Sequence, residues 1–123
     1  MSHIIFVYGT LMKGESNHFY IENQQYLGKA AIHGYNLYNL GHYPGIRPSK
    51  HNTRTVYGEL YSIDDNALKE VNRLEGEGSL YLLQHTEAQT ENGETMTAGI
   101  YVYNHETNEE KLIEGGDWQS KIS

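Results

Sequence analysis

The stretch Ile4-Ile5-Phe6-Val7-Tyr8-Gly9-Thr10-Leu11-Met12-Lys13-Gly14 carries an apolar strand directly into a glycine-containing loop. Residues 4–7 are four β-forming residues in succession, which predicts a buried strand. A glycine after such a strand lets the backbone approach a ligand closely, and the N–H groups of the loop suit an anionic oxygen. The sequence therefore predicts a ligand-binding loop at residues 8–14.

The loop also has the glycine spacing of a phosphate-binding loop, with four residues between Gly9 and Gly14. A phosphate-binding loop, however, needs a lysine and then serine or threonine after the second glycine. Here Glu15-Ser16 follows and places a negative charge where the phosphates would lie. This difference disfavours nucleotide hydrolysis. The alternative that the two glycines only turn the chain stays open.

A second informative stretch is Leu74-Glu75-Gly76-Glu77-Gly78-Ser79-Leu80-Tyr81, between a predicted helix and a predicted strand. A carboxylate at Glu75 would face the negative end of the helix dipole, which together with burial would raise its pKa. A glutamate with a raised pKa suits proton transfer near neutral pH. On position alone, a solvated glutamate at a helix end is the alternative, and we expect its neighbour Glu77 to be exposed.

Together the two stretches resemble the γ-glutamylcyclotransferase-like family of AIG2-like proteins. The loop of that family reads Tyr-Gly-(Thr/Ser)-Leu, and its catalytic glutamate lies in an aliphatic-Glu-Gly stretch shortly before a tyrosine. The matches here are residues 8–11 and Glu75 with Tyr81. The likeness extends to Gly58-Glu59-Leu60-Tyr61 and to Gly115-Gly116-Asp117-Trp118. Many members carry an arginine where this chain has Leu83.

The resemblance implies an enzyme that cyclises a small-molecule γ-glutamyl amide to 5-oxoproline and releases an amine or amino acid. By this analogy Glu75 is the general acid and base. The backbone N–H groups of Gly9, Thr10 and Leu11 would hold the substrate's α-carboxylate or polarise its reacting carbonyl. The two tyrosines Tyr8 and Tyr81 would line the pocket, with Tyr81 orienting either the substrate or Glu75. No cofactor is implied.

Two other functions stay open. One is a non-catalytic binding module for a small γ-glutamyl or acidic metabolite, and the other is an enzyme on the same scaffold that acts on another amide. The leaving group and the oligomeric state are not determined by the sequence.

The composition narrows the class of protein. A chain of 123 residues fits a single domain at residues 1–123. A formal charge of −7 without any lysine or arginine run argues against a nucleic-acid or anionic-membrane surface. The chain has no cysteine, which fits a cytoplasmic location. The apolar run at residues 4–7 is too short for a signal peptide or a membrane span, so we expect a soluble, unprocessed protein.

Metal and serine chemistry are not indicated. The seven histidines show no metal-ligand spacing, so we predict no metal site. Neither Ser16 nor Ser79 lies in a glycine-flanked nucleophile elbow, so a serine hydrolase is disfavoured.

One amphipathic helix is predicted after residue 63. Asp64 is a plausible N-cap, and Gly76 ends the segment. Leu68, Val71 and Leu74 recur at three-residue spacing, which places them in one apolar stripe.

The rest of the pattern consists mainly of strands. We expect a short helix at residues 16–25, one long bent strand or a hairpin at residues 26–40, an irregular loop around Pro44 and Pro48, a strand at residues 53–63, and antiparallel arms at residues 79–90 and 94–103 around Asn92-Gly93. These elements predict the α+β class. The resemblance implies a small, mostly antiparallel β-barrel flanked by short helices, with the ligand pocket at its mouth beside the first loop.

Overall fold

The computed structural model describes residues 1–50 and 54–120. It contains seven strands, one α-helix and three short 3₁₀ turns. The strands are β1 (His3–Val7), β2 (Gln25–His33), β3 (Tyr35–Asn39), β4 (Pro44–Pro48), β5 (Thr55–Ile63), β6 (Tyr81–Thr90) and β7 (Thr95–Tyr103). The helix is α1 (Asp65–Glu75), and the 3₁₀ turns are His18–Tyr20, Glu109–Lys111 and Trp118–Ser120.

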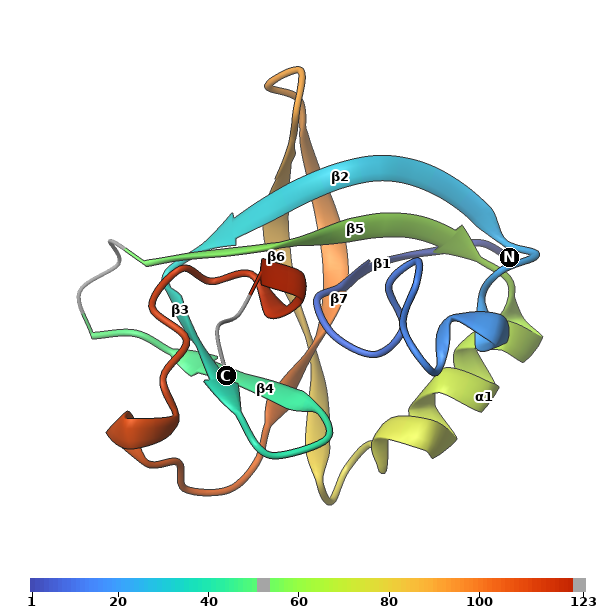
Figure 1. Ribbon diagram of the computed structural model, residues 1–123. Helices are drawn as coiled ribbons and strands as arrows, with labels where there is room; N and C mark the ends of the chain where they lie inside the picture. The colour runs from blue at the N-terminus through green and yellow to red at the C-terminus, as the bar shows by residue number, and fades with distance from the viewer. Residues whose placement is uncertain (51–53, 121–123) are drawn as a thin grey trace.

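Five strands close into a barrel in the order β1-β5-β2-β6-β7. Neighbouring strands are antiparallel except at the closure, where β1 meets β7 in parallel at Ile5 and Gly99. Strands β3 and β4 form a separate two-stranded sheet. Figure 1 shows this small sheet on one side of the barrel and α1 on the other, with the tip of the β6–β7 hairpin projecting beyond both. The predicted α+β barrel with a short flanking helix is therefore confirmed.

The core draws buried residues from all five barrel strands, with several from each of β1, β5 and β7. Phe6, Val56 and Leu60 have no exposed surface, and Ile5 is only 1% exposed. The apolar run at residues 4–7 forms β1 as predicted, and its register along β5 ends with Val7 opposite Glu59. The chain therefore leaves the barrel wall at Tyr8, where the glycine-containing loop begins.

The amphipathic helix is confirmed. The Asp64 side chain accepts a hydrogen bond from the N–H of Ala67 at 2.8 Å, which satisfies an N–H group at the helix start. Gly76 ends the helix with a left-handed φ of 61°, a backbone conformation that favours glycine. Val71 is fully buried, and Leu68 and Leu74 pack against the core. The helix boundaries thus follow from local capping.

The β6–β7 arms also pair as predicted, from Tyr81 opposite Tyr103 to Gln89 opposite Thr95. The predicted strand at residues 53–63 is confirmed from Thr55 onward, and Thr53 lies outside the described residues. For residues 26–40 the hairpin alternative is wrong, because β3 pairs with β4 instead. The chain bends at Gly34, where φ is 86°, and passes from the barrel into the small sheet.

The prediction of an irregular loop at Pro44 and Pro48 is wrong, because these residues bound β4. Pro44 lies opposite Asn39 and Pro48 opposite Tyr35. Proline has no N–H to donate, but it is tolerated at the ends of an edge strand, where a donor is not required. The partner strand therefore overrides the local turn signal.

The prediction of a helix at residues 16–25 is also wrong in its extent, because only the 3₁₀ turn His18–Tyr20 forms. The N–H groups of His18, Tyr20 and Ile21 each donate to the carbonyl three residues earlier. The N–H of Asn17 donates instead to the Thr10 carbonyl at 2.8 Å, which ties this segment to the preceding loop.

No helix in the described part of the chain is long and apolar enough to cross a membrane.

Candidate active site

The loop after β1 is held tightly where it leaves the barrel. The Tyr8 hydroxyl donates to the Tyr101 carbonyl at 2.5 Å, and the Met12 N–H donates to the Gly9 carbonyl at 3.1 Å. A Cβ on Gly9 would lie 2.5 Å from Cγ of Pro44, closer than two such atoms can approach. Gly9 is therefore required for the close approach of the loop to β4.

Three consecutive backbone donors of this loop have no acceptor among the described residues, namely the N–H groups of Gly9, Thr10 and Leu11. The N–H groups that follow, of Met12 and Lys13, are both hydrogen-bonded within the protein. Buried N–H groups in folded proteins nearly always have a partner, and successive free N–H groups in a loop form an anion-binding site. Gly9 itself is buried. The loop thus presents donors that suit a ligand's negative oxygen.

Glu75 is the last residue of α1 and lines the same cavity as this loop. Its side chain is partly exposed, and its carboxylate accepts no hydrogen bond from the described residues. Burial raises the pKa of Glu75 from the ordinary 4.5 to about 7. Burial is thus the physical cause of the shift that the sequence predicted. The carboxyl group can both lose and regain a proton near neutral pH.

Tyrosines form much of the cavity wall. The Tyr81 hydroxyl donates to the Pro44 carbonyl at 2.5 Å, so its proton is directed to the β3–β4 turn. The Tyr101 hydroxyl donates to Oδ1 of Asn72 on α1 at 2.5 Å. Burial raises the pKa of Tyr8, Tyr81 and Tyr101, and the nearby Glu75 carboxylate raises each further. All three hydroxyls therefore stay neutral at physiological pH.

The structure brings every predicted site residue to one cavity of about 30 Å³. The predicted residues that line it are Tyr8, Gly9, Thr10, Leu11, Glu75 and Tyr81. Sequence reasoning missed five further lining residues, which are Phe6 and Val7 of β1 together with Tyr43, Pro44 and Tyr101. Tyr101 lies on a strand that was predicted without any functional signal. Tyr43 and Pro44 reach the cavity only because β4 folds back beside the loop.

Two neighbours lie outside this cavity. Leu83, which stands where many γ-glutamylcyclotransferase-like proteins carry arginine, packs partly buried against the core. Glu77 is exposed, as the sequence predicted, and accepts a hydrogen bond from the Leu83 N–H at 3.2 Å. Glu75 is therefore the acidic residue of this stretch that lines the cavity.

A metal is not suggested by the side chains that the structure describes. Among residues 1–50 and 54–120, no group of three or more histidine or acidic side chains is arranged to hold an ion. His51, which was included in the prediction of no metal site, lies outside these residues.

Comparison with known families agrees with this fold. The family described as "Gamma-glutamyl cyclotransferase, AIG2-like" matches residues 5–120. The chain belongs to this family, which confirms the resemblance seen in the sequence.

Individual relatives support the same assignment. The chain is 43% identical over 114 residues to the gamma-glutamylcyclotransferase family protein YtfP of Escherichia coli, covering 93% of this chain and 94% of that protein. It is 35% identical over 108 residues to the gamma-L-glutamyl-butirosin B gamma-glutamyl cyclotransferase of Niallia circulans, covering 83% of this chain and 67% of that protein. The crystal structure of a mouse AIG2-like protein superposes with a TM-score of 0.80 at 23% identity, covering 95% of this chain and 88% of that one. At that identity the mouse structure speaks for the fold alone.

Proposed function

We propose that this protein cyclises a γ-glutamyl amide to 5-oxoproline, with Glu75 as general acid and base. The nitrogen of the free α-amine attacks the γ-amide carbonyl carbon and closes a five-membered ring. The bond between that carbon and the amide nitrogen breaks, and the leaving nitrogen gains the proton that the attacking nitrogen loses. The reaction consumes neither water nor an oxidant, because 5-oxoproline and the released amine together contain all the atoms of the substrate.

The proposal rests on Glu75, a carboxyl group with a pKa of about 7 that lines the cavity. The three residues whose N–H groups have no acceptor among the described residues, Gly9, Thr10 and Leu11, line the same cavity. An α-amine has an ordinary pKa of about 8 and is mostly protonated at neutral pH. The amine first gives up one proton to solvent and becomes nucleophilic. As the neutral amine attacks, Glu75 accepts a second proton from its nitrogen, and the same carboxyl group returns that proton to the leaving nitrogen. General acid–base catalysis of this kind contributes a factor of about 10²–10⁴.

The loop donors suit the negative groups of such a substrate. A γ-glutamyl group carries an α-carboxylate, and its reacting carbonyl gains negative charge in the transition state. The formal charge of the chain is −7, so an anionic group depends on local donors for its binding. The N–H groups of Gly9, Thr10 and Leu11 are such donors, and the neutral hydroxyls of Tyr8 and Tyr81 add no opposing charge.

The cavity is narrow in this structure, and its volume of about 30 Å³ leaves room for little more than water. Tyr43 is 38% exposed and lies in the turn between β3 and β4, outside the barrel ladder. We expect this turn to shift outward when substrate enters, because the other walls belong to the barrel and to α1.

Mass spectrometry of 5-oxoproline tests the proposal directly. Purified protein without added metal or nucleotide is incubated with a panel of γ-glutamyl amino acids and γ-glutamyl amines. We expect at least one panel member to give 5-oxoproline with the parent protein and none to give it with Glu75→Gln. The matched control is Glu77→Gln, because Glu77 is an exposed neighbour in the same stretch. Product formation that persists undiminished in Glu75→Gln would exclude Glu75 as the acid–base group.

Calorimetry separates this enzyme from a binding module. Tight binding of a panel member without any 5-oxoproline, in protein that is well folded, would contradict the proposed reaction and favour a non-catalytic role. The preferred panel member in the active case identifies the leaving group.

A further inference from the structure

The motif Gly58-Glu59-Leu60-Tyr61 contains a buried carboxylate that the proposed chemistry does not use. Glu59 is 6% exposed and is the one charged side chain classed as buried among residues 1–50 and 54–120. Burial of a carboxylate is costly unless donors compensate for the lost water. The position of Glu59 is therefore expected to serve a purpose beyond packing.

The two groups that donate hydrogen bonds to the Glu59 carboxylate indicate what this residue does. Oε1 of Glu59 accepts the backbone N–H of Lys13 at 3.0 Å and the hydroxyl of Tyr61 at 2.9 Å. Tyr61 is two residues further along β5, so it lies on the same face of the strand. Glu59 also lies opposite Val7, the last residue of β1. The carboxylate is thus placed beside the point where the loop leaves the barrel.

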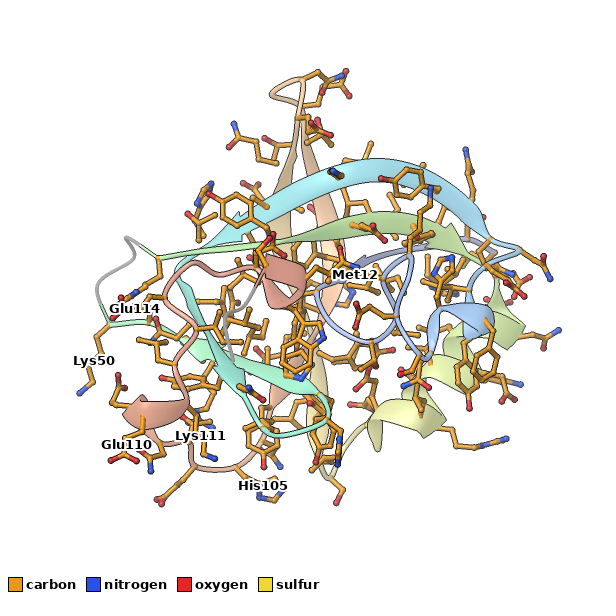
Figure 2. All side chains as sticks on the ribbon, in the orientation of Figure 1. Met12, Lys50, His105, Glu110, Lys111 and Glu114 are labelled. Carbon is orange, nitrogen blue, oxygen red and sulfur yellow. The ribbon has the colours of Figure 1, made fainter. Side chains whose placement is uncertain are left out.

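Lys13 is held on several sides at once. Its carbonyl accepts a hydrogen bond from Nε2 of Gln119 at 2.7 Å. Its ammonium nitrogen lies 3.4 Å from the centre of the Tyr26 ring, and that ring packs against Tyr61 with centroids 5.3 Å apart. Figure 2 shows the preceding residue, Met12, inside the molecule, where it is 3% exposed. The chain at residues 12–13 is therefore fixed, although the Lys13 side chain is exposed.

This fixed point lies directly after the uncommitted donors. The N–H groups of Gly9, Thr10 and Leu11 have no acceptor among the described residues, whereas those of Met12 and Lys13 do. Three free donors in succession keep a defined direction only if the chain on both sides is held. The upstream side is held by β1 and by the Tyr8 hydroxyl. The downstream side is held at Lys13, and its charged acceptor is Glu59. Charged acceptors make the stronger hydrogen bonds.

We propose that Glu59 is a positioning residue, which holds the Lys13 peptide and thereby orients the Gly9, Thr10 and Leu11 N–H groups for the anionic part of the substrate. The inference rests on the proposed function, because it assigns those donors to substrate binding. Glu59 does not line the Glu75 cavity, so it acts only through the loop.

The consequence is a change in substrate binding without a change in proton transfer. Loss of the Glu59 acceptor is expected to raise KM about tenfold, the effect of one hydrogen bond to a charged group. The value of kcat stays within about twofold, because Glu75 is untouched and because the α-carboxylate, to which the inference assigns these donors, carries the same charge in the ground state and the transition state. In Glu59→Gln the amide oxygen still accepts from Lys13 but carries no charge, so KM rises less than in Glu59→Leu.

The experiment compares four variants by steady-state kinetics and by amide hydrogen exchange at Lys13. They are Glu59→Leu, Glu59→Gln, Tyr61→Phe and the double variant Glu59→Leu/Tyr61→Phe. The single leucine variant leaves the Tyr61 hydroxyl without its acceptor and can lose stability for that reason alone. The double variant removes both polar groups and therefore leaves no Tyr61 hydroxyl without its acceptor. Its KM then reports the lost bond to Lys13 rather than a loss of stability at Tyr61. Tyr61→Phe is the matched control that keeps the bond to Lys13.

The expected result is a raised KM and faster exchange of the Lys13 N–H in both leucine variants, smaller changes in the same direction in Glu59→Gln, and near-parent values in Tyr61→Phe. A folded double variant with parent KM and parent exchange at Lys13 would overturn the proposal. Absence of 5-oxoproline from the parent protein across the whole panel would refute the proposed function instead. In that case unchanged Lys13 exchange in the leucine variants would overturn the loop-holding role, and accelerated exchange would support it.

Discussion

Replacement of Glu75 by glutamine is expected to stabilise the protein increasingly as pH rises. Burial raises the pKa of Glu75 from 4.5 to about 7, so the folded protein binds this proton more tightly than the unfolded chain does. The stabilising contribution of the protonated carboxyl is complete below the unfolded pKa and is lost as pH rises through the folded pKa. Glutamine does not titrate, so Glu75→Gln avoids this loss.

The magnitude follows from the same two values. The span from 4.5 to about 7 corresponds to about 3 kcal/mol of unfolding free energy. The unfolded chain has released part of this proton by about pH 5, so about 2.5 kcal/mol of the change falls between about pH 5 and about pH 8.5. A change of this size is a large fraction of the stability of an ordinary domain.

Urea unfolding at several pH values measures this change. The unfolding free energy of Glu75→Gln minus that of the parent protein is expected to grow by about 2.5 kcal/mol between about pH 5 and about pH 8.5. All other titrating groups cancel in this difference. The exposed Glu77→Gln variant is the control, because it makes the same chemical change at a residue outside the cavity. A flat difference for Glu75→Gln across the range would refute the argument that burial raises the pKa of Glu75.

Three further predictions follow from the site and its supports. The value of kcat/KM is expected to rise with pH through about 7 as Glu75 becomes the free base, and a profile that is already flat below this value would contradict its role. Gly9→Ala is expected to lower the unfolding free energy by about 1–3 kcal/mol, because the new Cβ would lie 2.5 Å from Cγ of Pro44; in urea unfolding, Gly115→Ala serves as the control, since a Cβ there has no atom within 4 Å. Asp64→Ala is expected to cost about 1 kcal/mol through loss of the N-cap bond to the Ala67 N–H, and an unchanged urea midpoint would argue against this cap.

The elements that the sequence predicted well are those whose boundaries are set by residues close to them in the chain. Helix α1 begins at a capping aspartate and ends at Gly76, both of which act within a few residues of the chain. The β6–β7 hairpin follows from two alternating arms around Asn92-Gly93. Each of these signals can be read without knowing what the element will pack against.

The elements that the sequence mispredicted depend on distant partners. Pro44 and Pro48 are local turn signals, but pairing with β3 makes their segment a strand. Residues 16–25 are polar residues with a few apolar ones, a pattern that predicted a short helix, but the bonds from Asn17 to the Thr10 carbonyl and hydroxyl tie the segment to the preceding loop. In both places a tertiary contact outweighs a weak local preference.

The candidate site divides in the same way. Residues 8–11 and Glu75 were predicted from the chain through motifs of adjacent residues that resemble the family, whereas their local pattern alone had left a simple turn and a solvated glutamate open. Tyr43, Pro44 and Tyr101 could not be predicted in this way, because they reach the cavity only through the fold. The role of Glu59 was likewise invisible, since its partner Lys13 is 46 positions away.

The sequence by itself determined the apolar strand, its loop, the capped helix and the family to which the chain belongs. The first three depend on residue types at short spacing, and the family depends on the order of several short motifs along the chain. Only the tertiary structure decided which distant side chains enclose Glu75 and how far its pKa rises. Burial is a property of the surrounding atoms, and those atoms come from β1, α1, β6, β7 and the β3–β4 turn. The chemistry of the carboxylate is therefore set by neighbours that the linear sequence separates.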